Sequence, residues 1–97
     1  MKQPSHVYIM SCKSRKVLYV GVTSKLEQRV KQHKNHTMPN SFTARYNCVD
    51  LVYFEEFPNI EEAILREKEI KGWSRKKKED LIKTLNPGMI DLALTLE

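Results

Sequence analysis

The chain has few of the residue types that cross-link a fold or anchor it in a membrane. Among its 97 residues are two cysteines, three glycines and one tryptophan. No run approaches the roughly 20 apolar residues of a membrane-spanning helix. Cys12 and Cys48 stand apart from each other and from any histidine pair, so we expect two small, half-buried side chains rather than a zinc site or a disulfide. The N-terminal residues lack the apolar core of a signal peptide, and we expect a cytoplasmic protein without membrane contacts.

The length suits one compact domain and is too short for two independent cores. Hydrophobic residues make up 40% and charged residues 30%, as in globular proteins generally. We expect a single domain over residues 1–97, with a core over about residues 6–85 and a tail over residues 86–97. The net charge of +5 and the pI of 9.3 favour an anionic partner, DNA first and RNA as the alternative.

Three segments have the composition of strands. Residues 6–12 and 17–22 are rich in β-branched and aromatic residues, and the polar residues 13–16 between them suit a hairpin loop. Residues 50–57 form a third run of this kind. We therefore predict a hairpin followed later in the chain by one more strand.

Polar residues at the expected spacing mark the beginnings of three helices. Ser24 and the glutamate three residues later fit a capping box, which predicts a helix over about residues 25–35. Asn59 repeats this signature before a second helix, which Gly72 ends. Ser74 is placed to cap a third helix.

The predicted order of elements is ββαβαα, with residues 36–47 as a loop and the third helix reaching about residue 85. A hairpin with helices packed on its sheet predicts an α+β fold with a mixed or antiparallel sheet. Residues 90–96 alternate partly with a period of two and also fit a short helix. Both readings of this segment stay open at the level of the sequence.

One acidic residue interrupts the apolar stripe of the second predicted helix. At about 100° per residue, Glu67 lies within about 20° of Ile60, at the centre of that stripe. The other glutamates of this helix fall on the solvent side. A carboxylate that faces a core is costly unless it is paired or lies in a cleft, so Glu67 is a candidate functional residue.

The first predicted helix has the same irregularity. Relative to Leu26, His33 lies at about 20° and Arg29 at about 60°, on the side that should face the core. Arg29 and His33 are one helical turn apart. They therefore present two polar groups to the interior from neighbouring positions.

The hairpin adds two tyrosines, and their placement depends on the turn. If the loop has an even number of residues, Tyr8 pairs with Gly21 and Met10 pairs with Tyr19. Tyr8 and Tyr19 then share a face, because side chains alternate along a strand. Gly21 leaves open space opposite Tyr8. A loop with an odd number of residues places the tyrosines on opposite faces.

Each of these residues has a structural explanation when it is taken alone. Strand tyrosines usually pack, a lone histidine is usually a surface or core residue, and Arg29 with Glu67 can form a structural ion pair. The coincidence of all these residues in a basic domain favours a functional site, because inward-facing titratable groups are typical of such sites.

The same residues carry a resemblance to a known family. The chain resembles the GIY-YIG nuclease superfamily, and within it a group of small single-domain bacterial proteins. The similarity extends over about residues 6–84, and the spacing of its motifs together is specific although each is short. The matching segments are Val7-Tyr8-Ile9, Leu18-Tyr19-Val20-Gly21, Arg29-x-x-x-His33 and Glu67.

The resemblance implies a small three-stranded antiparallel sheet flanked by helices, and hydrolysis of DNA phosphodiester bonds with one metal ion, Mg²⁺ or Mn²⁺. Tyr8 and Tyr19 match two motif tyrosines, one of which acts as or beside the general base. Arg29 matches the arginine that contacts the scissile phosphate. His33 matches a residue that assists proton transfer, and Glu67 matches the metal ligand. A single carboxylate suits Mg²⁺, which keeps much of its water shell.

The chain also departs from the family pattern. Val7 replaces the first glycine, Val20 replaces an isoleucine, and Val22-Thr23 stands where relatives often have a lysine. These departures concern turnover and substrate class rather than the fold.

Four cations at positions 75–78 begin the third predicted helix, where the helix dipole disfavours positive charge. This conflict favours a phosphate-facing role, with a solvated basic surface as the alternative. The adjacent Trp73 either stacks on a base or packs at the helix junction. The candidate nucleic-acid contacts are Arg45, Arg75, Lys76, Lys77 and Lys78.

We therefore expect a metal-dependent endonuclease that acts on DNA and selects DNA structure rather than sequence. A nucleic-acid-binding module of the same fold that cuts slowly or not at all is the alternative. A protein-interaction domain in which these residues are structural is the third interpretation.

Overall fold

The computed structural model of the protein describes residues 3–35 and 41–96. Within these segments no helix is long and apolar enough to cross a membrane. The elements follow the predicted order, with one short helix added before the third strand. They are β1 (Ser5–Ser11), β2 (Leu18–Thr23), α1 (Leu26–Lys34), α2 (Phe42–Arg45), β3 (Asp50–Phe57), α3 (Ile60–Lys71), α4 (Arg75–Leu85) and the 3-10 helix η1 (Ala93–Leu96).

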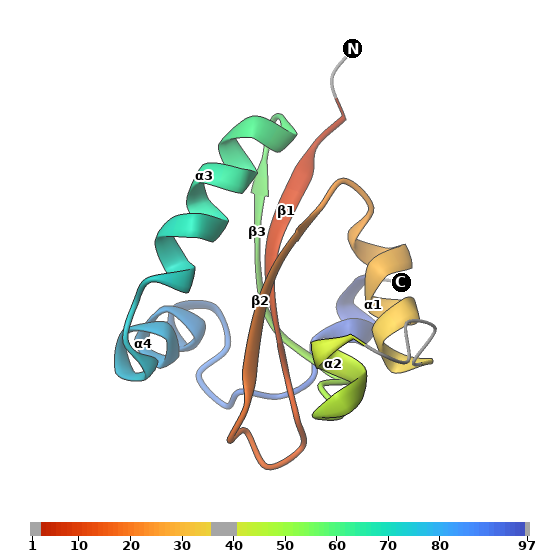
Figure 1. Ribbon diagram of the computed structural model, residues 1–97, viewed down its shortest axis with the longest axis vertical. Coiled ribbons are helices and arrows are strands. Elements are labelled where there is room, and N and C mark those ends of the chain that lie inside the picture. Colours follow the sequence, from red (N-terminus) through yellow and green to blue (C-terminus); the bar gives the residue numbers. More distant parts are fainter. Residues whose placement is uncertain (1–2, 36–40, 97) are drawn as a thin grey trace.

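A three-stranded sheet separates two groups of helices. The strand order is β2-β1-β3, and both strand pairs are antiparallel. α3 and α4 lie on one side of the sheet, and α1 and α2 lie on the other (Figure 1). The architecture is the α+β fold that the sequence predicts, with an antiparallel sheet flanked by helices.

The central strand β1 contributes to a core on each face of the sheet. Val7 and Ile9 belong to the core beneath α3 and α4, whereas Tyr8 and Met10 belong to the core beneath α1. All four side chains are buried. The strict alternation of side chains along a strand therefore makes β1 hydrophobic on both sides.

A bulge in β3 fits that strand to both cores. Ile9 pairs with Tyr53 and Met10 pairs with Leu51, so Val52 is the extra residue. The bulge places Leu51 and Tyr53 in different cores, although a regular strand would direct both to one face.

The predicted caps of the last two helices are confirmed. The side chain of Asn59 accepts a hydrogen bond from the amide of Glu62, and that of Ser74 accepts one from the amide of Lys77. α3 ends at Lys71, directly before Gly72 as predicted. These signals depend only on neighbours in the sequence, which explains why they were readable without the fold.

The predicted capping box at Ser24 is wrong. α1 begins after Lys25, whose side chain makes no capping hydrogen bond. The turn is held instead by Thr23 Oγ1, which accepts the Lys25 amide at 3.0 Å. Thr23 therefore stabilises the turn between β2 and α1 without capping the amides of the first helical turn.

The expected loop over residues 36–47 is also wrong for part of its length. Residues 41–47 contain α2, and Ser41 Oγ caps it by accepting the Ala44 amide at 3.2 Å. Residues 36–40 lie outside the described residues. A helix of one turn is too short for the repeated apolar pattern by which longer helices are recognised, although the sequence contains its cap.

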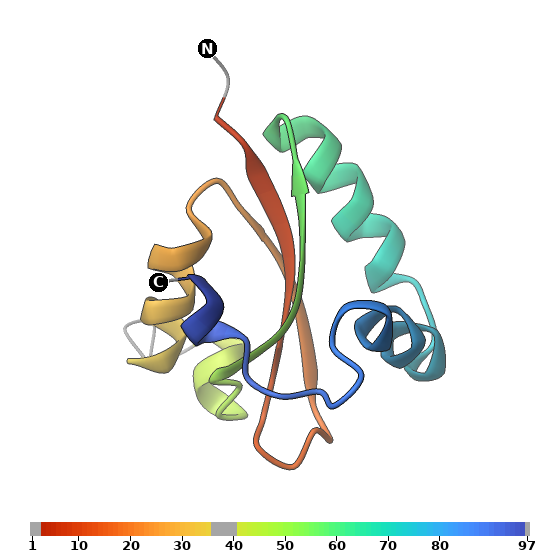
Figure 2. The same ribbon diagram turned by 180° about the vertical axis from the view of Figure 1, so that it is seen from behind.

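The tail after α4 crosses to the other side of the sheet and ends beside α1 (Figures 1 and 2). The Leu92 amide donates to the Leu51 carbonyl at 2.7 Å, and the Leu51 amide donates to Asp91 Oδ1 at 3.0 Å. Asp91 Oδ2 lies 2.6 Å from Lys34 Nζ at the end of α1. The tail therefore joins the edge of β3 to α1, and its last turn is η1 rather than a strand.

Replacing Asp91 with Asn should weaken this junction and flatten the acid dependence of stability. Burial raises the pKa of Asp91, but the hydrogen bond from Lys34 and the amides of Leu51 and Ala93 outweigh it and lower that pKa. A lowered folded-state pKa stabilises the fold above the ordinary value of about 4, and this stabilisation is lost as the pH falls.

Urea unfolding of wild type and Asp91→Asn between about pH 3 and pH 7 measures this contribution. Asp80→Asn is the matched control, because Asp80 forms an exposed pair with Lys76 on α4. Identical pH profiles for wild type and Asp91→Asn would show that the tail carboxylate does not stabilise the fold.

Candidate active site

The hairpin has the register that places both tyrosines on one face. Six residues, 12–17, separate β1 from β2, and Tyr8 pairs with Gly21 while Met10 pairs with Tyr19. The rings of Tyr8 and Tyr19 lie 6.3 Å apart between centroids. The expectation based on an even loop is therefore confirmed.

Gly21 makes room for the Tyr8 ring. A Cβ atom at Gly21 would lie 2.5 Å from both Cζ and Oη of Tyr8, well inside van der Waals contact. Because Tyr8 is buried and held from several sides, its ring cannot swing freely away. The glycine is thus required by the position of the tyrosine hydroxyl.

Tyr8 and His33 form the buried centre of the site. Tyr8 Oη lies 2.9 Å from His33 Nε2, and His33 Nδ1 lies 2.8 Å from Thr43 Oγ1. The ring of His33 also lies 5.7 Å from that of Tyr19. His33 therefore links β1, β2, α1 and α2 through one imidazole.

The surrounding hydrogen bonds are compatible with a His33 tautomer that carries its proton on Nδ1. Thr43 Oγ1 also lies 3.1 Å from Ser41 Oγ, which accepts the Ala44 amide. If Thr43 donates to Ser41, it accepts from His33 Nδ1–H, and Nε2 is then free to accept the Tyr8 hydroxyl proton. Burial, followed by the charge of Arg29, lowers the pKa of His33 to about 4, which keeps the imidazole neutral at pH 7.

The other residues of the site shift the pKa of Tyr8. Burial and the neighbouring Tyr19 raise the pKa of the Tyr8 hydroxyl well above its ordinary value. The charge of Arg29 lowers that pKa and the charge of Glu67 raises it. Glu67 on α3 and Arg29 on α1 therefore act on the same hydroxyl from opposite sides of the sheet.

Glu67 is the predicted carboxylate of the site, and its charge acts on Tyr8. Its side chain is 14% exposed, and Oε2 lies 3.4 Å from Lys71 Nζ, one turn further along α3. The helical wheel predicted a residue turned toward the interior, and the burial of Glu67 agrees with that prediction. Among the described residues, no group of three or more His, Cys, Asp or Glu side chains is placed to hold a metal ion.

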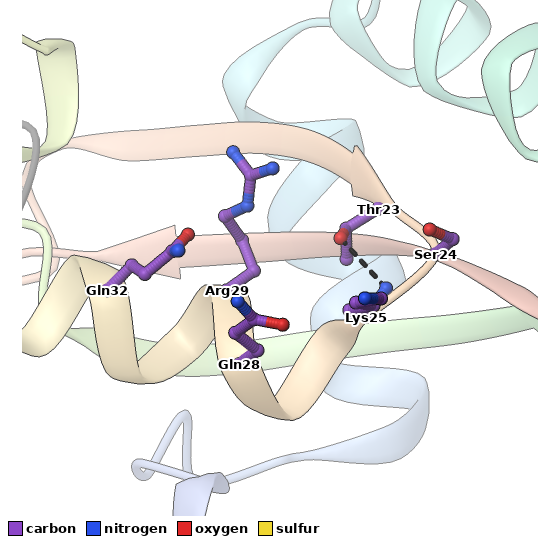
Figure 3. A pocket seen from close by; sticks show the side chains of 6 residues that line it. All are labelled: Thr23, Ser24, Lys25, Gln28, Arg29 and Gln32. Atoms are coloured by element: carbon purple, nitrogen blue, oxygen red, sulfur yellow. Dashed lines mark hydrogen bonds between the residues drawn. The ribbon is translucent and has the colours of Figure 1, made fainter.

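Arg29 lines a pocket of about 140 Å³ at the junction of β2 and α1. Figure 3 shows its side chain extending from α1 toward β2. The pocket is lined by polar and basic residues without a carboxylate, so its chemistry suits an anion. The lining residues are Thr23, Ser24, Lys25, Gln28, Arg29 and Gln32.

The basic run at the beginning of α4 has many partners within the protein. Arg75 donates to the carbonyl oxygens of Arg15 and Lys16 in the hairpin loop and pairs with Glu79. Lys76 pairs with Asp80 at 3.1 Å. These contacts offset the charge of two of the four cations at the helix N-terminus, and a role in binding nucleic acid stays a prediction.

Trp73 packs at the junction of α3 and α4, one of the two expected alternatives. It lies against the core under α3, and Lys77 Nζ is 4.2 Å from the centre of its ring. Arg66 approaches the same ring at 5.1 Å. Arg45, the other predicted nucleic-acid contact, is exposed on α2 beneath the site.

Sequence reasoning missed two parts of this site. Thr43 contacts His33 from a segment that was expected to be a loop, and no pattern in the sequence joins the two residues. Phe42 and Tyr46 extend the tyrosine cluster outward, with Phe42 5.8 Å from Tyr19. Their spacing of four residues was the available signal, because it places both rings on one side of a helical turn.

Comparison with known proteins shows the family of the chain. The model of the GIY-YIG catalytic domain matches residues 4–80. The chain belongs to the GIY-YIG family. That family forms a nuclease superfamily, and the matched segment contains all five residues of the site.

Relatives of the chain share most of its length. A UPF0213 protein of Clostridium perfringens is 44% identical over 78 residues, which cover 80% of this chain and 82% of the relative. A UPF0213 protein of Haloquadratum walsbyi is 40% identical over 81 residues, covering 84% and 89%. The solution NMR structure of a UPF0213 protein from Bacillus halodurans has 33% identity and a TM-score of 0.56, with 88% of each chain covered. The fold is therefore shared with this GIY-YIG-like group.

Replacing Gly21 with Ala should displace the Tyr8 ring and lower the free energy of unfolding by about 1–3 kcal/mol, as overpacking of a core does. Urea denaturation measures the stability, and NMR of the His33 imidazole reports whether Tyr8 still contacts it. Gly88→Ala is the control, because a Cβ there meets Ile90 at an ordinary distance of 3.5 Å. Equal stability of the two variants would disprove the steric role of Gly21.

The imidazole of His33 should titrate at about pH 4. An unfolded histidine titrates at about 6.5, so the unfolded chain binds more protons between these two pH values. The free energy of unfolding should therefore fall as the pH decreases through this window. NMR titration gives the pKa, and His33→Asn should reduce the slope of stability against pH; a His33 pKa near 6.5 would contradict this.

Proposed function

We propose that the protein is a metal-dependent endonuclease that hydrolyses DNA phosphodiester bonds. The observation that carries the proposal is that four polar side chains from β2, α1 and α3 contact Tyr8 of β1 or act by their charge on its buried hydroxyl. Membership of the GIY-YIG family supports it, because the matched domain is described as catalytic. The five residues are Tyr8, Tyr19, Arg29, His33 and Glu67.

Arg29 would bind the scissile phosphate. Its guanidinium offers a planar set of donors that matches phosphate oxygens, and the pocket beside it contains no opposing carboxylate. Lys25 lines the same pocket and adds a second positive charge. Binding here would place the phosphorus atom within reach of the two tyrosines.

Glu67 would hold the metal ion. With one carboxylate in place, the donor set fits Mg²⁺ or Mn²⁺ completed by water and phosphate oxygens, whereas structural Zn²⁺ needs about four protein ligands. The ion, when bound, would neutralise charge that develops on the phosphate. Lys71, which now pairs with Glu67, would have to share or release the carboxylate.

The tyrosines and His33 would move the proton of the attacking water. Tyr19 is half-buried and reaches solvent, whereas Tyr8 and His33 are buried behind it. Tyr19 would take a proton from water while its own proton passes to Tyr8 and that of Tyr8 passes to His33 Nε2. The hydroxide adds to phosphorus, the bond to the leaving oxygen breaks, and that oxygen takes a proton from solvent. The proton on His33 would then return through Tyr8 and Tyr19 to solvent, which restores the neutral imidazole.

A phosphate bound at Arg29 would make His33 a better proton acceptor. Arg29 is one of the two causes of the low His33 pKa, and an anion on its guanidinium cancels part of that charge. Without this effect His33 is a weak base. The same low pKa favours the second candidate function, a nucleic-acid-binding module that cuts slowly.

Incubation of the protein with single-stranded, duplex and branched DNA in Mg²⁺ or Mn²⁺ tests the proposal. Glu67→Gln and Tyr19→Phe should each lower the cleavage rate by about 100-fold, by loss of the metal ligand and of the proton path. Glu61→Gln, an exposed glutamate of the same helix, should keep the wild-type rate.

If both variants cleave DNA at the wild-type rate, the proposed site does not catalyse the reaction. Binding of DNA without cleavage of any substrate would favour the slow or inactive binding module. Thermal unfolding of each variant shows whether a lost rate reflects lost chemistry or a lost fold.

A further inference from the structure

A row of aromatic rings leads from the candidate active site to the surface. The ring of Tyr19 lies next to that of Tyr8, Phe42 stacks on Tyr19 with centroids 5.8 Å apart, and Tyr46 lies 4.7 Å from Phe42. We refer to Tyr19, Phe42 and Tyr46 as the aromatic row. It is continuous with the hydroxyl and imidazole of the site.

The outer rings are unusually open for paired aromatic side chains. Phe42 is 46% exposed and Tyr46 is 45% exposed, whereas Tyr8 at the inner end is 1% exposed. Packing in a core therefore accounts for only part of their surface. Exposed apolar surface of this kind is typical of a binding site when it adjoins a polar centre.

The charges around the aromatic row favour a nucleic acid as its partner. Arg45 lies on the same short helix, and Arg29, which lines the anion-suited pocket, acts by its charge on Tyr8 and His33. The chain as a whole has a net charge of +5. A ligand that carries phosphates and flat rings on one flexible strand satisfies both features.

We propose that Phe42 and Tyr46 form a base-stacking subsite, which binds the nucleobase of a nucleotide flanking the phosphate held at Arg29. This inference rests on the proposed function, because it requires a nucleic-acid strand in the site. Stacking on an aromatic ring tolerates any base, since every base has a flat π face. The subsite therefore contributes affinity and position rather than sequence selection.

Stacking would also orient the reacting phosphate. A base fixed on Phe42 restricts the rotation of its own sugar and phosphate, which favours one geometry of attack. Tyr19 belongs both to the aromatic row and to the proposed proton path. Positioning of the base and activation of water would share this one side chain.

Comparison of an intact oligonucleotide with an abasic one isolates the stacking contribution, because both carry the same phosphates. The probe is a fluorescein-labelled oligonucleotide of about ten mixed bases, and its partner has abasic residues throughout; the binding constants are measured in EDTA so that no cleavage occurs. The full-length wild type should bind the intact strand about tenfold more tightly than the abasic one.

Phe42→Ala and Tyr46→Ala should each reduce this ratio toward one, while binding of the abasic strand stays unchanged. Phe42→Leu keeps apolar contact with Tyr19 but removes the flat ring. It should therefore lower the ratio of the two binding constants as well, and it tests the subsite in a folded protein if Phe42→Ala proves unstable. Leu65→Ala is the control, because Leu65 is 69% exposed on α3 and lies outside the aromatic row.

A wild type that does not distinguish the two strands would overturn the subsite. The same holds if the Phe42 and Tyr46 variants keep the ratio of the Leu65 control. Failure of the nuclease proposal has a different signature, namely a base-dependent ratio without cleavage in Mg²⁺ or Mn²⁺. If the wild type cleaves DNA but binds the intact and abasic strands equally well, the nuclease proposal stands and the subsite is rejected.

Discussion

The pairing of Tyr8 with Gly21 fixes the geometry on which the site depends. Side chains alternate along a strand, so a shift of one residue in the hairpin would send Tyr8 and Tyr19 to opposite faces. The absence of a side chain at Gly21 leaves space for the Tyr8 hydroxyl. That hydroxyl then contacts His33, which joins the central strand to α1. The missing side chain of Gly21 thus makes possible a contact between β1 and α1.

Solvation divides the site into an inner and an outer part. The Tyr8 and His33 rings are buried and satisfied by hydrogen bonds that continue through Thr43 to Ser41. A satisfied buried network is rigid, because breaking one bond leaves an unpaired polar group. Tyr19, Arg29 and Glu67 keep contact with solvent. The inner part therefore holds the geometry, and the outer part is available to a substrate.

Local signals in the sequence predicted most of the fold. Asn59 and Ser74 cap their helices through hydrogen bonds to residues three positions away, so their roles follow from neighbours alone. The inward placement of His33 and Glu67 follows from helical periodicity, which is equally local. The predicted cap at Ser24 was wrong. The neighbouring Thr23, whose hydroxyl is an equally good acceptor, accepts the hydrogen bond in this turn.

Contacts between distant segments were beyond the reach of these signals. Thr43 meets His33 because α2 folds back on α1, and the row through Phe42 depends on the same event. The partners of Arg75 in the hairpin loop are 59 and 60 residues away in the sequence. The positive charge of the run was visible in the sequence, but the carbonyl oxygens that offset it become neighbours only after folding.

The tail also protects an edge of the sheet. β3 is an outer strand, and the unpaired amide and carbonyl groups of such a strand are a template for pairing with another chain. Asp91 and Leu92 occupy both backbone groups of Leu51, at the apolar end of β3. The segment after α4 thereby covers the apolar part of this edge, and the backbone groups of Leu51 are closed to pairing with a strand of another chain.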